Sequence, residues 1–358
     1  MNANVRTNCC LQISICGMYL KITPLFNFIT HVFFSLFLSV IDTLINLNNS
    51  LEFKSRNQVG YLPSTVKFHL TERMEEERPS GVISKWLGGL ISTMRRLLFT
   101  FMSSGPIPQH IAFIMDGNRR FAKKWKLDDQ SAGCKAGFPS LLSVLKYCYE
   151  VGVKYVTVYA FSLDNFNRRP DEVQYVMDIM YEKIQGVLKE MDMVNRYGIR
   201  VLFIGDLNRL DEPVRLAAEK AMEATAKNTK TYLLVCVAYT SSHEIPRAIY
   251  EACQEKSLAL PSSAKNDDGI VNDDDDDDVI KVVDLEKHMY MGVAPDPDIL
   301  VRSSGETRLS NFLLWQSTNS LLYSPKALWP EMGFLQVVWG ILKYQNKCYY
   351  LEKKKKQA

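Results

Sequence analysis

From Gly105 onward, apolar and polar positions alternate between two patterns. Short runs rich in β-branched residues predict strands, and longer stretches with apolar residues every three or four positions predict helices between them. The expected strands are 111–115, 155–161, 199–204, 232–238 and 299–301, and the expected helices are 138–150, 171–194, 212–226, 244–257 and 283–290. This alternation favours the α/β class, with a central parallel β-sheet flanked by helices. Ligands of such sheets bind at the carboxyl ends of the strands.

Two apolar stretches precede this α/β region. Residues 22–41 carry no formal charge and are long enough to span a bilayer, although a poorly structured or untranslated leader is the alternative. Residues 83–102 carry apolar side chains at helical spacing beside basic ones, which suits a helix in a membrane interface or one packed on protein. The expected organisation is a leader over 1–73, an amphipathic helix over 74–104, the α/β domain over 105–351 and a basic tail over 352–358.

Composition and charge exclude several classes of protein. The 358 residues include 43 Lys and Arg and 40 Asp and Glu, and the net charge of +3 argues against a general nucleic-acid binder. The eight cysteines show no Cys-x-x-Cys spacing, so neither a zinc ribbon nor a disulfide framework is indicated. Residues 261–280 contain six consecutive aspartates, a pattern that favours a solvated, disordered loop over a metal site.

Glycine and charged side chains follow three of the expected strands. They are Asp116, Gly117, Asn118, Arg119 and Arg120 after the first strand, Asn165 and Arg168 after the second, and Arg302, Arg308 and Ser310 after the last. Arginines and backbone amides at such turns bind phosphate oxygens, and an aspartate is a hard ligand suited to Mg²⁺ bridged by diphosphate. Each motif alone also fits a capped surface turn. Three cationic strand ends at one sheet edge predict a polyphosphate pocket, and the missing Gly-x-x-x-x-Gly-Lys-Ser/Thr sequence excludes a P-loop.

Three sequence blocks carry a family resemblance: HIAFIMDGNRRFAKK (110–124), YVTVYAFSLDNFNRRPDEV (155–173) and ILVRSSGETRLSNFLLWQ (299–316). In content, order and spacing they resemble the signature blocks of cis-prenyltransferases. The amino-acid sequence as a whole is most similar to plant dehydrodolichyl diphosphate synthases and rubber cis-polyprenyltransferases. The resemblance implies that the sheet and helices enclose a hydrophobic tunnel. It also implies a transferase that condenses isopentenyl diphosphate in cis onto an allylic diphosphate, such as farnesyl diphosphate, with Mg²⁺, to give a dolichol- or rubber-type polyprenyl diphosphate.

The resemblance also assigns roles to individual residues. Asp116 is expected to hold Mg²⁺ and to be catalytic, together with Asn165, which orients isopentenyl diphosphate where its C2 proton leaves. The allylic diphosphate is expected to bind Gly117, Asn118, Arg119, Arg120 and Arg168, and Phe121 belongs to the same substrate-binding set. Isopentenyl diphosphate is expected to bind Arg302, Arg308 and Ser310.

The sequence departs from the family pattern in two places. Cys134 stands where family members usually carry histidine, which weakens a polar contact near the diphosphate because a neutral thiol cannot replace an imidazolium donor. Leu321 stands where single-subunit bacterial members carry glutamate, and no Arg-x-Gly occurs near the C-terminus. The resemblance therefore implies a heteromer in which a Nogo-B-receptor-like partner completes the active site and this chain is the catalytic subunit.

Two other functions are weighed against the enzyme. A membrane-associated scaffold subunit with weak or no activity fits Cys134 and the leader, but the intact block from Asp116 to Arg120 argues against it. An all-helical trans-prenyltransferase lacks support because its aspartate motifs are missing. A polyisoprenoid product is insoluble in water, so the tunnel mouth is expected to face a membrane surface. The resemblance places the enzyme at the endoplasmic reticulum membrane, with its active site facing the cytosol.

Overall fold

The computed structural model describes residues 82–127, 132–259 and 280–355. The leader over 1–73, its apolar stretch at 22–41 and nearly all of the acidic segment 261–280 lie outside the described residues. The chain divides into two compact units, Met1–Leu97 and Leu98–Ala358, and the second contains the α/β domain.

A six-stranded parallel sheet forms the centre of the second unit, with strand order β3-β4-β2-β1-β5-β6. The strands are β1 (His110–Ile114), β2 (Tyr155–Ser162), β3 (Ile199–Ile204), β4 (Thr231–Tyr239), β5 (Ile299–Arg302) and β6 (Leu321–Tyr323). All five expected strands are confirmed, and β6 is an addition of only three residues. Because every pairing is parallel, the carboxyl ends of the strands meet at one edge of the sheet.

The described residues form nine α-helices, of which α3 to α10 belong to the same unit as the sheet. They are α2 (Val82–Met102), α3 (Asn118–Lys124), α4 (Ala132–Val151), α5 (Pro170–Lys189), α6 (Met191–Tyr197), α7 (Glu212–Ala224), α8 (Ser241–Ala259), α9 (Val282–His288) and α10 (Phe334–Lys355). The single helix expected over 171–194 is wrong, because the backbone leaves helical geometry at Glu190 (φ −105°, ψ 29°) and divides it into α5 and α6. The helices α3 and α10 were not expected from the pattern of apolar residues.

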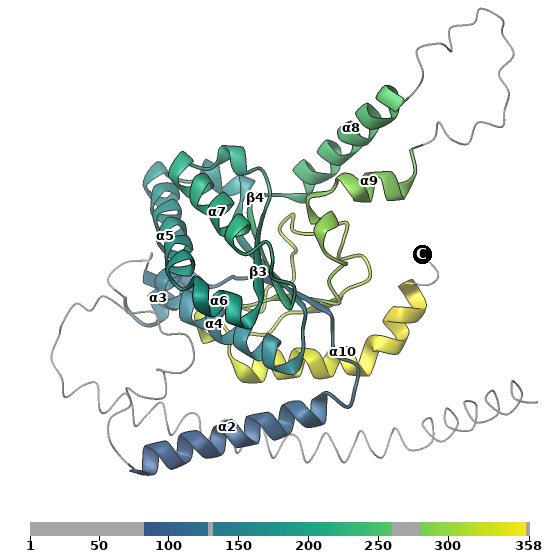
Figure 1. Cartoon of the computed structure of the whole chain (residues 1–358). Helices are drawn as coiled ribbons and strands as arrows, with labels where there is room; N and C mark the ends of the chain where they lie inside the picture. The colour runs from purple at the N-terminus through teal and green to yellow at the C-terminus, as the bar shows by residue number, and fades with distance from the viewer. Residues whose placement is uncertain (1–81, 128–131, 260–279, 356–358) are drawn as a thin grey trace, which may run out of the picture. The chain divides into compact units, whose positions relative to one another are not determined.

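Each face of the sheet has its own apolar cover. On one face, Phe161, Val201 and Phe203 pack with buried residues of α5 and α7, which lie side by side in Figure 1. On the other face, Ala112, Ile114, Leu234 and Leu300 pack with Phe312 and Leu313, which belong to the segment after β5. This segment is therefore part of the core, although it contains no regular helix or strand.

The helix expected at 83–102 is confirmed as α2, and its last turn belongs to the second unit. There Leu98, Phe99 and Met102 are buried, and the Phe99 ring lies 5.4 Å from that of Phe334. Of the two expectations for this helix, packing on the protein is therefore the one that holds for its C-terminal end. Among the described helices, none combines the length and apolar character needed to span a bilayer.

His110 lies buried at the start of β1. Its Nδ1 lies 2.6 Å from the carbonyl oxygen of Pro295, which can only accept, so Nδ1 carries the proton and Nε2 accepts from the Thr157 hydroxyl at 2.7 Å. Burial lowers the pKa of His110 from 6.5 to about 4, although the hydrogen bond to Pro295 opposes the shift. The unfolded chain therefore takes up a proton at a higher pH than the folded chain does, and acid favours unfolding across this window.

We expect the free energy of unfolding to fall by about 2 kcal/mol between pH 7 and pH 5 through His110 alone. Urea unfolding of the wild type and of His110→Gln at both pH values checks this. The variant has no imidazole at this position, so its loss between the two pH values is smaller by that amount. Equal losses in the two proteins would show that another group causes the acid sensitivity.

Candidate active site

Asp116 lies just beyond β1, and backbone contacts fix its position. Its N–H donates to the Ser303 hydroxyl at 2.9 Å, and its carbonyl oxygen accepts from the same hydroxyl at 2.7 Å. The carbonyl also accepts from the Trp329 N–H at 2.9 Å. Two segments that are distant in the sequence thus hold this residue at the carboxyl edge of the sheet.

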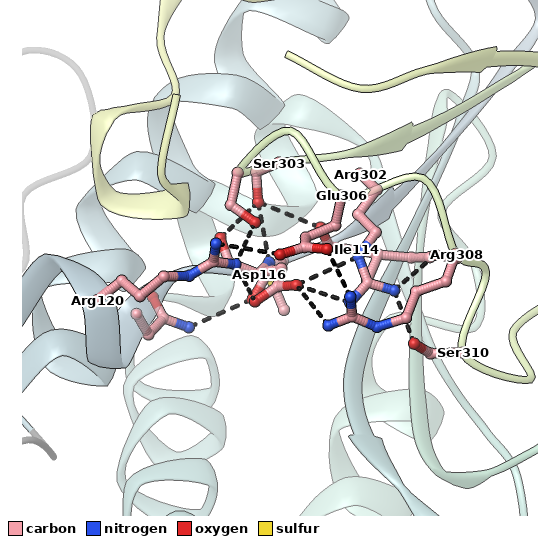
Figure 2. Close-up of polar contacts among 11 residues, drawn as sticks. Ile114, Asp116, Arg120, Arg302, Ser303, Glu306, Arg308 and Ser310 are labelled. Atoms are coloured by element: carbon pink, nitrogen blue, oxygen red, sulfur yellow. Dashed lines mark hydrogen bonds and ion pairs between the residues drawn. The ribbon is translucent and has the colours of Figure 1, made fainter. Parts of the chain in front are cut away.

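Three arginines point at the Asp116 carboxylate (Figure 2). Arg302 donates to Oδ2 from Nη2 at 2.6 Å and from Nε at 3.2 Å. Arg120 donates from Nη2 to Oδ1 at 3.3 Å, and Arg308 places Nη2 3.9 Å from Oδ2. The arginines come from α3 and from the segment that begins at the end of β5, as strand-end reasoning predicts.

Burial distinguishes the three arginines. The side chain of Arg302 is 6% exposed, and its Nη1 also donates to the Arg308 carbonyl at 2.6 Å and to the Ser310 hydroxyl at 2.7 Å. Arg120 and Arg308 are 48% and 62% exposed, and each forms an ion pair with Glu306. Exposed ion pairs contribute little stability, so these two guanidinium groups can exchange Glu306 for another anion at small cost.

Asp116 is held in its ionised form. Burial acts to raise the pKa of its carboxyl group, but the hydrogen bond and charge of Arg302, followed by the charge of Arg120, outweigh burial and hold the pKa below its ordinary value. The carboxylate is therefore charged at neutral pH. Its share of the folding free energy is present above its unfolded pKa and is lost as the pH falls through the lower folded pKa.

Gly117 provides the turn that leads into α3. Its φ of 104° lies in the left-handed region that favours glycine, and a Cβ here would lie 2.9 Å from the Leu328 side chain. The next residue, Asn118, donates from Nδ2 to the Met115 carbonyl at 3.4 Å. Its Oδ1 is buried without a hydrogen-bond partner. Gly117 and Asn118 thus bring the start of α3 close to Asp116.

Arg119 and Arg168 are a second cationic pair at this edge, because they follow the carboxyl ends of β1 and β2, which are neighbours in the sheet. Burial lowers the pKa of Arg168, and the positive charge of Arg119 lowers it further, so the two guanidinium groups act on one another. Cys134 follows Gly133 in α4, where a Cβ would lie 2.0 Å from the Asn118 carbonyl oxygen, so this turn of α4 lies against the start of α3. Like charges held near each other are stabilised by an anion bound between them.

Two expected site residues have mainly local contacts in the structure. Asn165 Oδ1 accepts from the Ser162 N–H at 3.2 Å, within a capping box at the start of a short 3₁₀ helix (Leu163–Asn167). The ring of Phe121 lies 6.0 Å from that of Trp125. A helix cap therefore accounts for Asn165 in part, although the sequence pattern gave no sign of this contact.

The structure also places Leu321, the position where bacterial family members carry glutamate. Leu321 begins β6 and pairs with Ile299, three residues before Arg302 on the neighbouring strand. That offset corresponds to about 10 Å along the strand. The side chain at 321 therefore lies towards the amino edge of the sheet, away from Asp116 of the same chain.

Ser303, Ser304 and Glu306 are site residues that were not singled out from the sequence. Ser303 brackets the Asp116 backbone, Ser304 Oγ accepts from Arg120 Nη2 at 2.6 Å, and Glu306 lies between Arg120 and Arg308. They directly follow Arg302, so the signal was their position after β5. Their contacts with Arg120 cross 184 and 186 residues of sequence, which no local pattern encodes.

The site offers a divalent cation one well-placed carboxylate. Among the described residues, no group of three or more His, Cys, Asp or Glu side chains is arranged to hold a metal ion. Mg²⁺ in phosphate-binding sites is typically held by one or two carboxylates together with substrate oxygens and water. The ionised, partly exposed Asp116 fits that arrangement with a diphosphate as co-ligand.

The fold and site together define a class: an α/β protein with an arginine-rich anion site around one carboxylate at the carboxyl edge of a parallel sheet. Residues 114–350 match the family model Prenyltransf, described as "Putative undecaprenyl diphosphate synthase". The chain belongs to this family of cis-prenyltransferases, and it is an enzyme of prenyl transfer.

Curated relatives agree with this assignment. Dehydrodolichyl diphosphate synthase 6 of Arabidopsis thaliana is 54% identical over 283 residues, which cover 77% of this chain and 96% of the relative. Rubber cis-polyprenyltransferase HRT2 of Hevea brasiliensis is 52% identical over 285 residues, covering 78% and 96%. The human "Dehydrodolichyl diphosphate synthase complex subunit DHDDS" is 38% identical over 267 residues, covering 74% and 75%.

A solved structure supports the fold. Lavandulyl diphosphate synthase from Lavandula x intermedia, in complex with dimethylallyl diphosphate, superposes with a TM-score of 0.59 at 27% sequence identity. The match covers 67% of this chain and 95% of the lavender enzyme.

Proposed function

We propose that this chain is a long-chain cis-prenyltransferase that condenses isopentenyl diphosphate onto farnesyl diphosphate or a longer allylic diphosphate. The observation that carries the proposal is the convergence of Arg120, Arg302 and Arg308 on the Asp116 carboxylate, beside the cationic pair Arg119 and Arg168. Five guanidinium groups at one sheet edge suit two diphosphates. The dolichol- and rubber-forming relatives point to a polyprenyl diphosphate product.

The family resemblance assigns the two halves of this arginine cluster to two neighbouring diphosphates. Arg119, Arg120 and Arg168, with Gly117, Asn118 and Phe121, serve the allylic diphosphate. Arg302, Arg308 and Ser310 serve isopentenyl diphosphate. As the allylic carbon–oxygen bond breaks, negative charge grows on the leaving pyrophosphate, and guanidinium donors already in place stabilise it.

The remaining steps need no side-chain nucleophile. The isopentenyl double bond attacks the allylic carbon as its bond to pyrophosphate breaks, and the proton that leaves C2 of the isopentenyl unit near Asn165 passes to the released pyrophosphate. Asp116 positions both diphosphates through the arginines it orients. Mg²⁺, when bound by Asp116 and the diphosphate oxygens, supplies further neutralisation of the leaving group.

The growing chain needs an apolar space that excludes water, because water would capture the allylic cation. We place this tunnel beside α4 and α5. These helices approach each other at Lys135 with Tyr175 (5.6 Å from nitrogen to ring centre) and at Lys183 with Phe138 (4.9 Å). Buried residues of α5 pack with those of α7, whereas α4 contributes none to that cluster, so the side of α5 that faces α4 is suited to line a lumen.

A partner subunit completes the enzyme in this proposal. Residue 321 is a leucine and has no carboxylate, and it lies away from Asp116. This position of the chain therefore adds no charged group to the site. The human relative is named as a subunit of a complex. We infer that the partner is a Nogo-B-receptor-like subunit that supplies an Arg-x-Gly segment to the active site. We place the complex at the endoplasmic reticulum membrane, with its active site facing the cytosol.

We expect Cys134→His to strengthen binding of the allylic substrate. An imidazole N–H next to Arg168 adds a donor that the thiol lacks, so KM for farnesyl diphosphate falls about two- to fivefold, with KM for isopentenyl diphosphate unchanged. Steady-state kinetics of the reconstituted enzyme measure this. Cys134→Ser is the matched control, because its short hydroxyl keeps the size of the thiol. An unchanged KM in Cys134→His would place residue 134 outside the diphosphate site.

Incorporation of labelled isopentenyl diphosphate tests the proposed function. The full chain, a Nogo-B-receptor-like partner and membranes are mixed with farnesyl diphosphate, with and without Mg²⁺. The expected result is Mg²⁺-dependent label in a chloroform-soluble product longer than the primer. A chain that binds farnesyl diphosphate but incorporates no label would be a scaffold, and the proposal would be wrong.

A further inference from the structure

The segment after β5 passes through unusual backbone geometry next to the site. The φ angles are 50° at Ser310, 59° at Asn311 and 46° at Leu313, all in the left-handed region. Side chains of L residues are disfavoured there, and asparagine is among the residues that tolerate it best. Such conformations persist when surrounding contacts hold them. The contacts that hold this segment therefore determine where Ser310 lies.

The first turn of α8 supplies those contacts. The N–H of Ser241 donates to the Asn311 carbonyl at 2.9 Å, and the N–H of Ser242 donates to Asn311 Oδ1 at 3.1 Å. In return Asn311 Nδ2 donates to the Ser242 hydroxyl at 2.7 Å. Asn311 thus satisfies two backbone donors that a helix start leaves open, while α8 fixes both its backbone and its side chain.

The first turn of α8 also carries a buried residue, Glu244, which ties the helix to the core. Glu244, with no exposed surface, accepts from the Tyr239 hydroxyl at 2.5 Å, the Met291 N–H at 3.0 Å and Gln316 Nε2 at 3.1 Å. Gln316 belongs to the same segment as Asn311. The start of α8 and this segment are therefore tied together at two points, one beside Ser310 and one deeper in the core.

The other side of Ser310 contacts the anion site. Its hydroxyl accepts from Arg302 Nη1 at 2.7 Å, and the Arg308 carbonyl accepts from the same nitrogen at 2.6 Å. The backbone from Arg308 to Ser310 therefore wraps the Arg302 guanidinium group. Asn311 is the next residue, and it connects the backbone around Arg302 to α8.

We propose that Asn311 is a positioning residue for the isopentenyl diphosphate side of the site. By fastening the left-handed backbone to Ser242, it holds Ser310 and the Arg308 carbonyl against Arg302. The inference rests on the proposed function, because it assigns this half of the arginine cluster to isopentenyl diphosphate. It predicts that the contact between α8 and Asn311 affects one substrate and leaves the other unaffected.

Titration of the full chain in complex with its partner subunit tests the inference. Isopentenyl diphosphate is added in the presence of Mg²⁺ and saturating farnesyl thiolodiphosphate, an unreactive allylic analogue. Asn311→Gly keeps the left-handed backbone and removes the side-chain bonds. We expect its affinity for isopentenyl diphosphate to fall about five- to tenfold and its affinity for the allylic analogue to stay within twofold. In the reconstituted enzyme, KM for isopentenyl diphosphate rises by the same factor.

Two further variants keep the test decisive. Ser242→Ala removes only the bond from Asn311 Nδ2 to the exposed Ser242 hydroxyl and keeps the bond from the Ser242 N–H to Asn311 Oδ1. It is expected to weaken isopentenyl diphosphate binding about two- to threefold, even if Asn311→Gly fails to fold. Asn228→Ala is the matched control, because Asn228 also bonds a carbonyl and an amide side chain, at Ile199 and Asn195, away from the site. It is expected to lower stability without changing either affinity.

The outcomes separate the inference from the proposed function. If the wild-type complex binds neither ligand, the proposed function is wrong and the inference falls with it. If the wild type binds both and Asn311→Gly and Ser242→Ala keep its affinity for isopentenyl diphosphate, only the inference is wrong. An equal loss for both ligands would indicate general disruption of the site and would also contradict it.

Discussion

Asp116→Asn is expected to lower turnover about 10³-fold in the reconstituted enzyme. The amide has nearly the shape of the carboxylate, but it removes the negative charge that Arg302 and Arg120 share and the carboxylate that we assign to Mg²⁺. Without that charge the arginines lose their common orientation, so the leaving pyrophosphate is poorly stabilised. Incorporation of labelled isopentenyl diphosphate measures the loss.

Asp206→Asn is the matched control for this prediction. Asp206 lies beyond the end of β3, its side chain is 21% exposed against 23% for Asp116, and it also accepts from an arginine, Arg209, at 3.1 Å. It lies outside the arginine cluster, so turnover should stay within about twofold of the wild type. A comparable loss in both variants, or full turnover in Asp116→Asn, would contradict the role assigned to Asp116.

Arg302→Lys is expected to lower kcat/KM for isopentenyl diphosphate about 100-fold and the free energy of unfolding by about 2 kcal/mol. The planar guanidinium group of Arg302 bonds Asp116, Ser310 and the Arg308 carbonyl at once, in a buried position. A lysine keeps the charge, but a single ammonium nitrogen cannot reach all three partners in one geometry. Steady-state kinetics and urea unfolding measure the two effects.

Arg247→Lys separates lost stability from lost function. Arg247 is also a multiply bonded arginine, with Glu251 at 2.6 Å, the His288 carbonyl at 3.4 Å and the Tyr290 ring at 4.2 Å. We expect it to lose stability and to retain kcat/KM. If Arg302→Lys changed stability alone, as this control does, Arg302 would be a structural residue and the diphosphate site would lie elsewhere.

The fold was predictable where local chemistry determines it. Runs such as 199–204 and 232–238 are apolar and β-branched, and the structure turns each into a buried parallel strand. β6 was not predictable in this way, because a strand of three residues is too short to show a recognisable alternation of buried and exposed side chains. By contrast, α10 carries a usable signal, since Phe334, Val337, Val338, Ile341 and Tyr344 recur at helical spacing and are buried.

The site was predictable in outline for a similar reason. In a parallel sheet every strand delivers its following residues to the same edge, so Asp116, Arg302 and Arg308 meet although they are far apart in the sequence. The bonds between α8 and Asn311 were not predictable, because they join residues 69 positions apart and depend on a left-handed turn. Reading the residues after β4 in the same way would have drawn attention to Ser241 and Ser242.

The most direct test of the account is a crystal structure of the chain with isopentenyl diphosphate, farnesyl thiolodiphosphate and Mg²⁺. The account predicts two diphosphates side by side at the carboxyl edge of the sheet. One should lie within hydrogen-bonding distance of Arg302, Arg308 and Ser310, the other near Arg119, Arg120 and Arg168, with Asp116 between them. Diphosphates bound elsewhere, or a single diphosphate that both ligands compete for, would contradict it.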